Sequence, residues 1–281
     1  MRDCLRSLVA ILPESTGEIL IVADGSPDGF QDAVGPLPTA PGWTARWLAV
    51  PAGGPAKARN RALPEARGEL VLFLNDDVRC EPGLLRAHDA AHRRQPGHAV
   101  MGNTRWAPEV VTSEFMHLVA HHDSFYYLIA DPTDAGWEYF HTMNLSLDRR
   151  WIEAGHRFDE AFPDPAFEDT ELGYRLAKQH GLRIAFCAEA VLYHVHGFTA
   201  EQYVEKSFMR GRSARRFCAL YPELTDRIIR EYQWSAAHGA RLRTKVRALL
   251  GRTDPVEHWN ADIAVAFLKG YEAGVENSTG G

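Results

Sequence analysis

The sequence has few of the features that mark membrane-spanning, disulfide-bonded or nucleic-acid-binding proteins. No apolar run among its 281 residues is long enough to span a bilayer, and no secretory signal peptide is visible. Its four cysteines are scattered, with neither the spacing of a metal site nor a disulfide framework. A net charge of -6 argues against general binding to nucleic acids. Together these absences predict a reduced, cytoplasmic protein.

Charge is unevenly distributed along the chain. The stretch from Glu205 to Arg252 is strongly basic, although the whole protein is acidic. Within it, Arg241–Leu250 interleaves basic and apolar residues, a pattern that suits a helix lying on an anionic membrane surface or packing on a partner. The simpler interpretation is a solvated helix face. We expect at most a peripheral contact with the inner face of a membrane.

Helical and strand patterns alternate through the first two thirds of the chain, which predicts an α/β fold with a mainly parallel sheet. The composition, 45% hydrophobic and 24% charged, is that of an ordinary globular protein. We expect a domain over residues 1–198 and a helical C-terminal extension over residues 199–281. The predicted helices before that extension include Asp3–Leu12, Pro82–Gln95 and Asp148–Ala154, and the predicted strands are Glu18–Val22, Arg46–Val50, Leu70–Leu74, His98–Gly102, His141–Leu147, Arg183–Cys187 and Ala190–Tyr193.

The chain is organised around an apolar strand that ends in acidic residues. Leu70–Leu74 is the kind of run that is buried on both faces in a parallel sheet, and Asn75, Asp76 and Asp77 follow it directly. Open α/β sheets bind their ligands at the carboxyl ends of such strands. Hard oxygen ligands suit Mg²⁺ or Mn²⁺ that also grips a diphosphate. The alternative is an acidic turn that caps the next helix.

Two further segments have the composition of a nucleotide site. Asp24 leaves a strand into the Gly-rich turn Ala23–Gly29, where it can reach a ligand across the sheet edge or form a simple Asx-turn. The segment Gly53–Ala62 predicts a helix with proline in its first turn and with Lys57 and Arg61 on one face. A helix N-terminus beside basic side chains is a good phosphate site. A solvated basic helix is the alternative.

The candidates for acid–base and metal chemistry lie later in the chain. Glu168, Asp169 and Glu171 crowd the start of a predicted helix. The helix dipole stabilises acidic residues there. Three carboxylates exceed what a cap needs, however, and their mutual repulsion raises the pKa of at least one, which suits a general base. Strand alternation puts His194 and His196 on one face, so that both can point to one site.

The region Phe115–Tyr139 is rich in aromatic residues and histidine. The helical spacing of His117 and His121 would allow a metal pair, but no carboxylate ligand accompanies it. We expect an aromatic wall, either in the core or lining a substrate cleft.

In order, these segments resemble the motifs of the inverting family 2 of GT-A glycosyltransferases, over roughly Asp3 to Gly197. Each motif is weak alone, and the ordered set is specific. The matching segments are Asp24–Asp28, similar to the nucleotide-binding turn D-G-S-x-D; Gly54–Asn60, similar to G-x-x-x-A-R-N; Phe73–Asp77, similar to the metal motif in its N-D-D form; Asn144–Ser146 on the acceptor side; Phe167–Arg175, similar to the E-D motif; and Tyr193-His194.

The resemblance implies a Rossmann-like GT-A fold and transfer of a sugar, with inversion, from a nucleotide-diphosphate sugar to an acceptor hydroxyl. The acceptor would be a saccharide, a lipid or a protein in polysaccharide or glycoconjugate biosynthesis. Asp169, with Glu168 beside it, would be the catalytic base. Mn²⁺ or Mg²⁺ would be held by Asp77 with His194 or His196. The residues implied in substrate binding are Asp24, Asp28, Lys57, Arg59, Asn75, Asp76, Asn144 and Glu171.

The sequence departs from the family pattern in two places. Asn75 stands where a strict D-x-D motif has its first aspartate, so metal binding relies on Asp77, with Asp76 nearer the sugar or ribose. Family members usually open with a strand before the first helix, whereas this sequence begins at that helix, so we expect a sheet without its usual first strand. Two other functions remain open: a catalytically impaired, glycosyltransferase-like scaffold, and a sugar nucleotidyltransferase.

Overall fold

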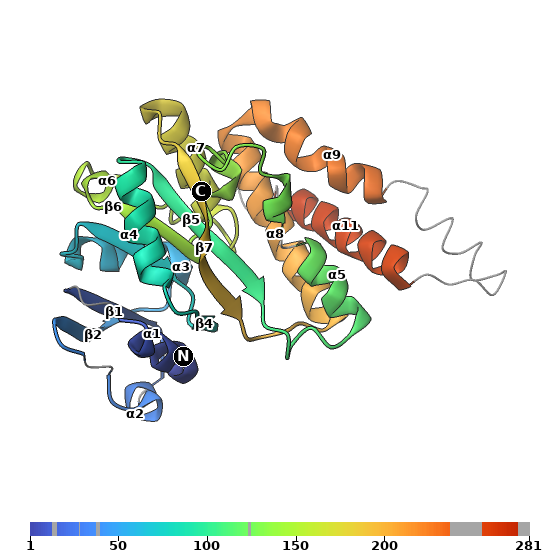
Figure 1. Cartoon of the computed structure of the whole chain (residues 1–281). Helices are drawn as coiled ribbons and strands as arrows, with labels where there is room; N and C mark the ends of the chain where they lie inside the picture. Colours follow the sequence, from blue (N-terminus) through green and yellow to red (C-terminus); the bar gives the residue numbers. More distant parts are fainter. Residues whose placement is uncertain (13–15, 28, 38–39, 123–124, 237–254, 275–281) are drawn as a thin grey trace. The chain divides into compact units, whose positions relative to one another are not determined.

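The computed structural model describes the chain apart from residues 13–15, 28, 38–39, 123–124, 237–254 and 275–281. It divides into two compact units (Figure 1). The first unit consists of Met1–Val111, Ala120–Glu160 and Asp169–His196, and the second of Thr112–Val119, Ala161–Glu168 and Gly197–Gly281. The predicted domain boundary after residue 198 stays a prediction. The predicted basic helix Arg241–Leu250 lies outside the described residues.

The first unit alternates helices and strands, as the sequence predicts. Its helices are α1 (Arg2–Ala10), α2 (Phe30–Val34), α3 (Gly54–Ala62), α4 (Leu84–Arg94), α6 (Arg150–Glu153) and α7 (Glu168–His180, whose first residue belongs to the second unit). Its strands are β1 (Gly17–Asp24), β2 (Trp43–Val50), β3 (Leu70–Leu74), β4 (Val78–Cys80), β5 (Ala99–Trp106), β6 (Asn144–Asp148) and β7 (Ile184–His194). Short 3₁₀ turns cover Leu63–Glu65, Phe125–Leu128 and Trp137–Tyr139.

The strands form two sheets. β1 and β2 pair in parallel, and the other five strands have the order β3-β6-β5-β7-β4. The two longest pairings, β1 with β2 and β5 with β7, are parallel. β6 pairs antiparallel with β3 and β5, and β4 pairs antiparallel with β7. The α/β prediction is confirmed. Within the described residues β1 and β3 lie in separate sheets.

Side-chain alternation along the strands gives the five-stranded sheet a separate core on each face. Met101 and Ile184 point to one face, where they pack in a buried cluster with Leu176 of α7. Their neighbours Val100 and Ala185 point to the other face, in a cluster that contains residues of α1 and α4. Both faces of the sheet are therefore covered.

The structure differs from the predicted elements in three places. β7 is one strand where we predicted two, because residues 188–190 of β7 bulge out opposite Gly102/Asn103 of β5 and pairing then resumes at Val191. The three-residue strand β4 was not predicted. The aromatic region contains helix α5 (Glu114–His122), most of which belongs to the second unit.

The second unit is helical. It contains α8 (Ala200–Leu220), a 3₁₀ turn (Pro222–Leu224), α9 (Thr225–Ala236) and α11 (Pro255–Ala273). Thr199 starts α8 with a capping box, in which its hydroxyl accepts from the Gln202 backbone N–H and the Gln202 side chain accepts in return. Phe217 and Phe267 are fully buried in this unit. No helix in the described ranges is both long and apolar enough to cross a bilayer.

All four cysteines are buried free thiols. Burial raises the pKa of each thiol, to about 11 for Cys4 and about 12 for Cys80. The pKa values of Cys187 and Cys218 are raised for the same reason. These thiols therefore act as small apolar side chains rather than as nucleophiles.

A buried polar network ties α4 to the sheet. Both ring nitrogens of His88 are engaged, Nδ1 with Ser146 Oγ at 2.7 Å and Nε2 with Asn144 Oδ1 at 2.9 Å. His92 Nε2 shares the same Ser146 hydroxyl at 2.7 Å. The Asn144 amide donates to the Ala190 carbonyl of β7 at 2.9 Å. Burial lowers the pKa of His88 from 6.5 to about 4, so the folded protein holds this ring neutral.

Acidification should therefore destabilise the fold through His88. The folded-state pKa lies below the unfolded value, so the unfolded chain binds more protons, and stability is lost as the pH falls from about 6.5 to about 4. The full shift corresponds to roughly 3 kcal/mol. Urea unfolding between pH 7 and pH 4.5 should show a shallower pH dependence for His88→Gln than for the wild type. His117→Gln, at an exposed histidine, is the control, and equal slopes for all three proteins would contradict the assignment.

Candidate active site

Asp24 ends β1 and joins it to the start of α3. One carboxylate oxygen accepts from the Gly53 N–H at 2.8 Å and the other from the Gly54 N–H at 2.9 Å. The parallel register places Asp24 opposite Val50 at the end of β2. The carboxylate thus lies at the carboxyl edge of the small sheet, where the positive end of the α3 dipole stabilises it.

This contact changes the predicted role of the α3 N-terminus. Two of its first N–H groups already donate to Asp24, so that terminus is not an open phosphate cradle. Lys57 is exposed, whereas Arg59 is half-buried with its guanidinium 5.4 Å from the centre of the Phe158 ring. Asp28, the other aspartate of this turn, lies outside the described residues.

Asn60, at the end of the predicted A-R-N segment, has a positioning role that the sequence analysis missed. Its side-chain carbonyl accepts from the Phe158 backbone N–H at 3.0 Å, and its amide donates to the Phe158 carbonyl at 2.9 Å. Both bonds go to one residue, so they align the loop at Phe158 with α3 as a strand partner would. No local sequence pattern signals a contact of this range.

The acidic turn after β3 meets a histidine across the sheet. Val78 of β4 pairs with His194 of β7, and the Val195 N–H donates to the Asp77 carbonyl at 3.0 Å. This register brings Asp77 Oδ1 to 3.5 Å from His194 Nδ1. Contact with His194 lowers the pKa of Asp77, against the opposing effect of burial. Asp76, by contrast, is exposed.

The Asp77–His194 pair leaves two facing polar atoms without a hydrogen bond. The facing atoms Oδ1 and Nδ1 are both buried, and neither has a hydrogen-bond partner in the described part of the chain. Trp106 stacks against the His194 ring at 5.0 Å between centroids and fixes its orientation. His196 is exposed two residues further on. Among the described residues no three side chains of His, Cys, Asp or Glu gather as a closed metal cluster.

Asp169 lies in the first turn of α7 and is held on both oxygens. Oδ2 accepts from the backbone N–H and the hydroxyl of Thr142, at 3.1 and 3.3 Å. Oδ1 accepts from the Thr170 N–H at 2.8 Å. The side chain is half-buried. Phe167, which precedes this turn in the chain, has a φ of 67°, a left-handed conformation that is costly for a bulky residue.

Three predicted site residues lie in the interior. Asn144 is fully buried, and its amide is bonded to His88 and Ala190. Glu171 is buried, and its two carboxylate oxygens accept from Nε and Nη2 along one edge of the Arg175 guanidinium, at 2.8 and 3.0 Å. Glu168 is only 4% exposed. These placements give no support to the prediction that Asn144 and Glu171 bind substrate directly, because neither side chain reaches solvent.

The strand registers place the remaining candidates at one edge of the five-stranded sheet. Leu74, directly before Asn75–Asp77, pairs with Asn144, so the acidic turn lies beside the segment that carries Thr142. Trp106 pairs with His194 at the same edge. The Asp77–His194 pair and the Thr142–Asp169 contact are thus neighbours in the fold. The edge thus carries a carboxylate–imidazole pair and a half-buried carboxylate, at the end of the sheet where α/β proteins bind their ligands.

Comparisons with known proteins identify the family and the fold. The model of the family described as "Glycosyl transferase family 2" matches residues 1–153. The chain is similar to the structure of the mannosyltransferase PcManGT from Pyrobaculum calidifontis in complex with GDP-Man and Mn²⁺, with 16% identity and a TM-score of 0.60 over 93% of this chain and 78% of that one. It is also similar to S. aureus TarS in complex with UDP, with 15% identity and a TM-score of 0.50 over 98% and 87% of the two chains. No curated protein matches the sequence.

Replacing Asp24 should weaken the fold even without a ligand. In Asp24→Asn the amide NH₂ faces a backbone N–H, so one of the two bonds is lost; because the Gly53 bond is exposed and the Gly54 bond half-buried, the cost should be about 0.5–1.5 kcal/mol. Urea unfolding measures this loss. Asp32→Asn, which removes an exposed carboxylate from α2, should change the stability by less than about 0.5 kcal/mol. Equal effects of the two variants would refute the structural role of Asp24.

Proposed function

The chain belongs to glycosyl transferase family 2, and we propose that it transfers a sugar, with inversion, from a nucleotide-diphosphate sugar to an acceptor hydroxyl. The family makes it a glycosyltransferase, and the fold is that of the GT-A enzymes. The observation that supports the finer proposal best is the Asp77–His194 pair at the sheet edge that also carries Asp169. Inverting transfer needs one stabilised leaving group and one base, and these residues are suited to provide them.

The donor would bind where β1 and β3 end. Asp24 and Asp28 would contact the base or ribose, with Lys57 and Arg59 near the nucleotide. Asp24 can do so while it holds α3, because each carboxylate oxygen accepts more than one hydrogen bond. Asn75 and Asp76 would lie nearer the ribose or sugar, and the exposure of Asp76 is compatible with that role.

Asp77 and His194 would hold Mn²⁺ or Mg²⁺, with His196 as the further candidate ligand. A carboxylate oxygen and an imidazole nitrogen that face each other without a hydrogen bond suit a divalent cation. The protein would supply only part of the shell, and donor phosphates would supply the rest. When bound, the ion would neutralise the charge that develops on the leaving diphosphate. Trp106 would keep the His194 ring in its ligating orientation.

Asp169 would accept the proton of the attacking hydroxyl. It is half-buried, whereas Glu168 is almost fully buried, which favours Asp169 as the base and leaves Glu168 a supporting role. The Thr142 contacts would orient the carboxylate. We assign Asn144 and Glu171 to positioning, since Asn144 anchors β6 and Glu171 fixes Arg175. The acceptor class, whether saccharide, lipid or protein, is left to experiment.

Asp169→Asn should abolish transfer and leave donor binding nearly intact, because the amide keeps the shape of the side chain and cannot take a proton. We expect a loss of at least about a thousandfold in rate, within the range for a removed general base. Transfer or hydrolysis of UDP- and GDP-sugars measures the rate, and calorimetry measures donor binding. Asp89→Asn, at a surface carboxylate of α4 that pairs with Arg93, is the control. Full activity of Asp169→Asn would exclude the residue as the base.

His194→Ala should remove the metal-dependent part of donor binding. A nucleotide at about a hundred times its dissociation constant stabilises a protein by roughly 2.7 kcal/mol, which a thermal shift detects. The wild type should show a larger shift with a nucleotide and Mn²⁺ than with the nucleotide alone, and His194→Ala should lose that difference. His117→Ala should retain it. A difference that persists in His194→Ala would move the metal away from this residue, and no shift with any donor would favour the scaffold alternative.

A further inference from the structure

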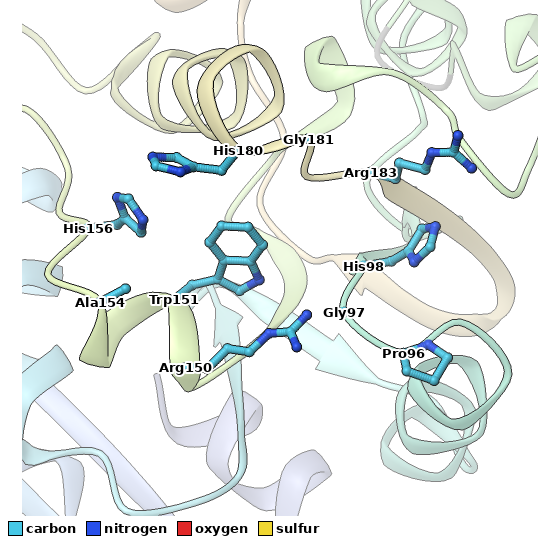
Figure 2. A pocket seen from close by; sticks show the side chains of 10 residues that line it. All are labelled: Pro96, Gly97, His98, Arg150, Trp151, Ala154, His156, His180, Gly181 and Arg183. Carbon is cyan, nitrogen blue, oxygen red and sulfur yellow. The ribbon is translucent and has the colours of Figure 1, made fainter.

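A cleft opens at the end of the five-stranded sheet opposite the candidate active site. Its volume is about 690 Å³, within the range of small-molecule sites. It lies where β5 and β7 begin, whereas Trp106 and His194 end these strands. The 11 residues of β7 separate the two ends by roughly 30 Å. The lining residues, shown in Figure 2, are Pro96, Gly97, His98, Arg150, Trp151, Ala154, His156, His180, Gly181 and Arg183.

The lining is cationic and aromatic, with no carboxylate in it. Two arginines and three histidines contribute, and both arginines are exposed. The nearest acids contact the outer edges of the guanidinium groups: Asp148 lies 3.5 Å from Arg150 Nε, and Asp134 lies 3.7 Å from Arg183 Nε. In each case the acid engages the Nε edge, so Nη donors remain for an anion.

Trp151 forms the middle of the cleft wall. Figure 2 shows its indole between the two histidines of one side, His156 and His180, and the arginine beside it. The ring centroids of His156 and His180 are 5.8 and 6.2 Å from the indole, and the Arg150 guanidinium is 5.7 Å from it. The buried Nε1 of Trp151 has no hydrogen-bond partner in the described part of the chain. Since this atom is buried, a ligand in the cleft would meet the Arg150 guanidinium and the indole ring rather than the indole N–H.

The backbone at Gly97 lies against the Arg150 guanidinium. Gly97 has a φ of +85°, and a Cβ atom there would collide with Arg150 Nη2. The absent side chain lets the guanidinium lie against the loop before β5. His156 lies 4.5 Å from His180, and burial, His180 and two nearby arginines lower its pKa.

We propose that this cleft binds a phosphate ester carried on a sugar-sized body. Arg150 and Arg183 would donate to the phosphoryl oxygens, and the flat face of Trp151 would pack against the carbon body. The cleft is far larger than a bare phosphate, which is why we assign it an ester and not the free ion. It shares no residue with the proposed donor site, so the inference does not rest on the proposed function.

Isothermal titration of the full chain with glucose 6-phosphate, inorganic phosphate and glucose tests the proposal. Glucose 6-phosphate should bind saturably and more tightly than inorganic phosphate, and glucose should not bind. Arg150→Gln should weaken binding of the ester at least tenfold. Arg93→Gln, which removes an exposed charge from α4, should leave it within twofold. The melting temperature of each free variant and its affinity for UDP or GDP with Mn²⁺ show whether the fold and the other site are intact.

Three results would overturn the assignment. The first is the absence of saturable binding by both phosphate probes. The second is equal weakening in Arg150→Gln and Arg93→Gln, which would indicate general attraction to a positive surface. The third is displacement of glucose 6-phosphate by UDP or GDP, which would place the probe in the donor site. If Arg150→Gln lowers the melting temperature, Arg183→Gln replaces it as the test variant.

Discussion

The register of β7 is the constraint on which the rest of the first unit depends. One strand pairs in parallel with β5 and antiparallel with β4, and each pairing fixes the position of a functional side chain. A slip of one residue would turn His194 to the opposite face of the sheet. It would also carry the start of the strand out of line with the loop at Gly97. Hydrogen bonds along β7 therefore hold both ends of the unit in a defined relation.

Buried polar groups support this register. Asn144 links β6 to β7 through the Ala190 carbonyl and links β6 to α4 through His88. Each member of the network is bonded, which makes it specific for one arrangement of strands, since another would bury unpaired amides and rings. The candidate base depends on the same strand order, because Thr142 immediately precedes β6 in the chain and holds Asp169. Core and site are thus built from adjacent residues.

The sequence predicted elements whose signal is local. The run Leu70–Leu74 is apolar throughout and matches β3 residue for residue. β4 has three residues, too few to show a period, so it was missed. β7 was divided in two because Ala188 and Glu189 interrupt its apolar pattern, and only the pairing with β5 shows that they form a bulge within one strand.

The site was predictable as a set of residue types and not as a geometry. The resemblance to family 2 predicted that Asp77 and His194 belong to one site, and the structure places them side by side. Asn144 was predicted to contact substrate because Asn144–Ser146 resembles the acceptor-side segment of the family. Its burial depends on His88 and Ala190, which are distant in sequence. The cleft around Trp151 carries no motif, since its residues come from the ends of separate elements.

The four buried thiols have a practical consequence for spectroscopy. None is exposed, and burial disfavours the thiolate of each, so maleimide reagents should react with the folded chain slowly. A single cysteine introduced at an exposed position would then carry a fluorophore or spin label alone. The natural protein offers a background for distance measurements without prior removal of its own cysteines.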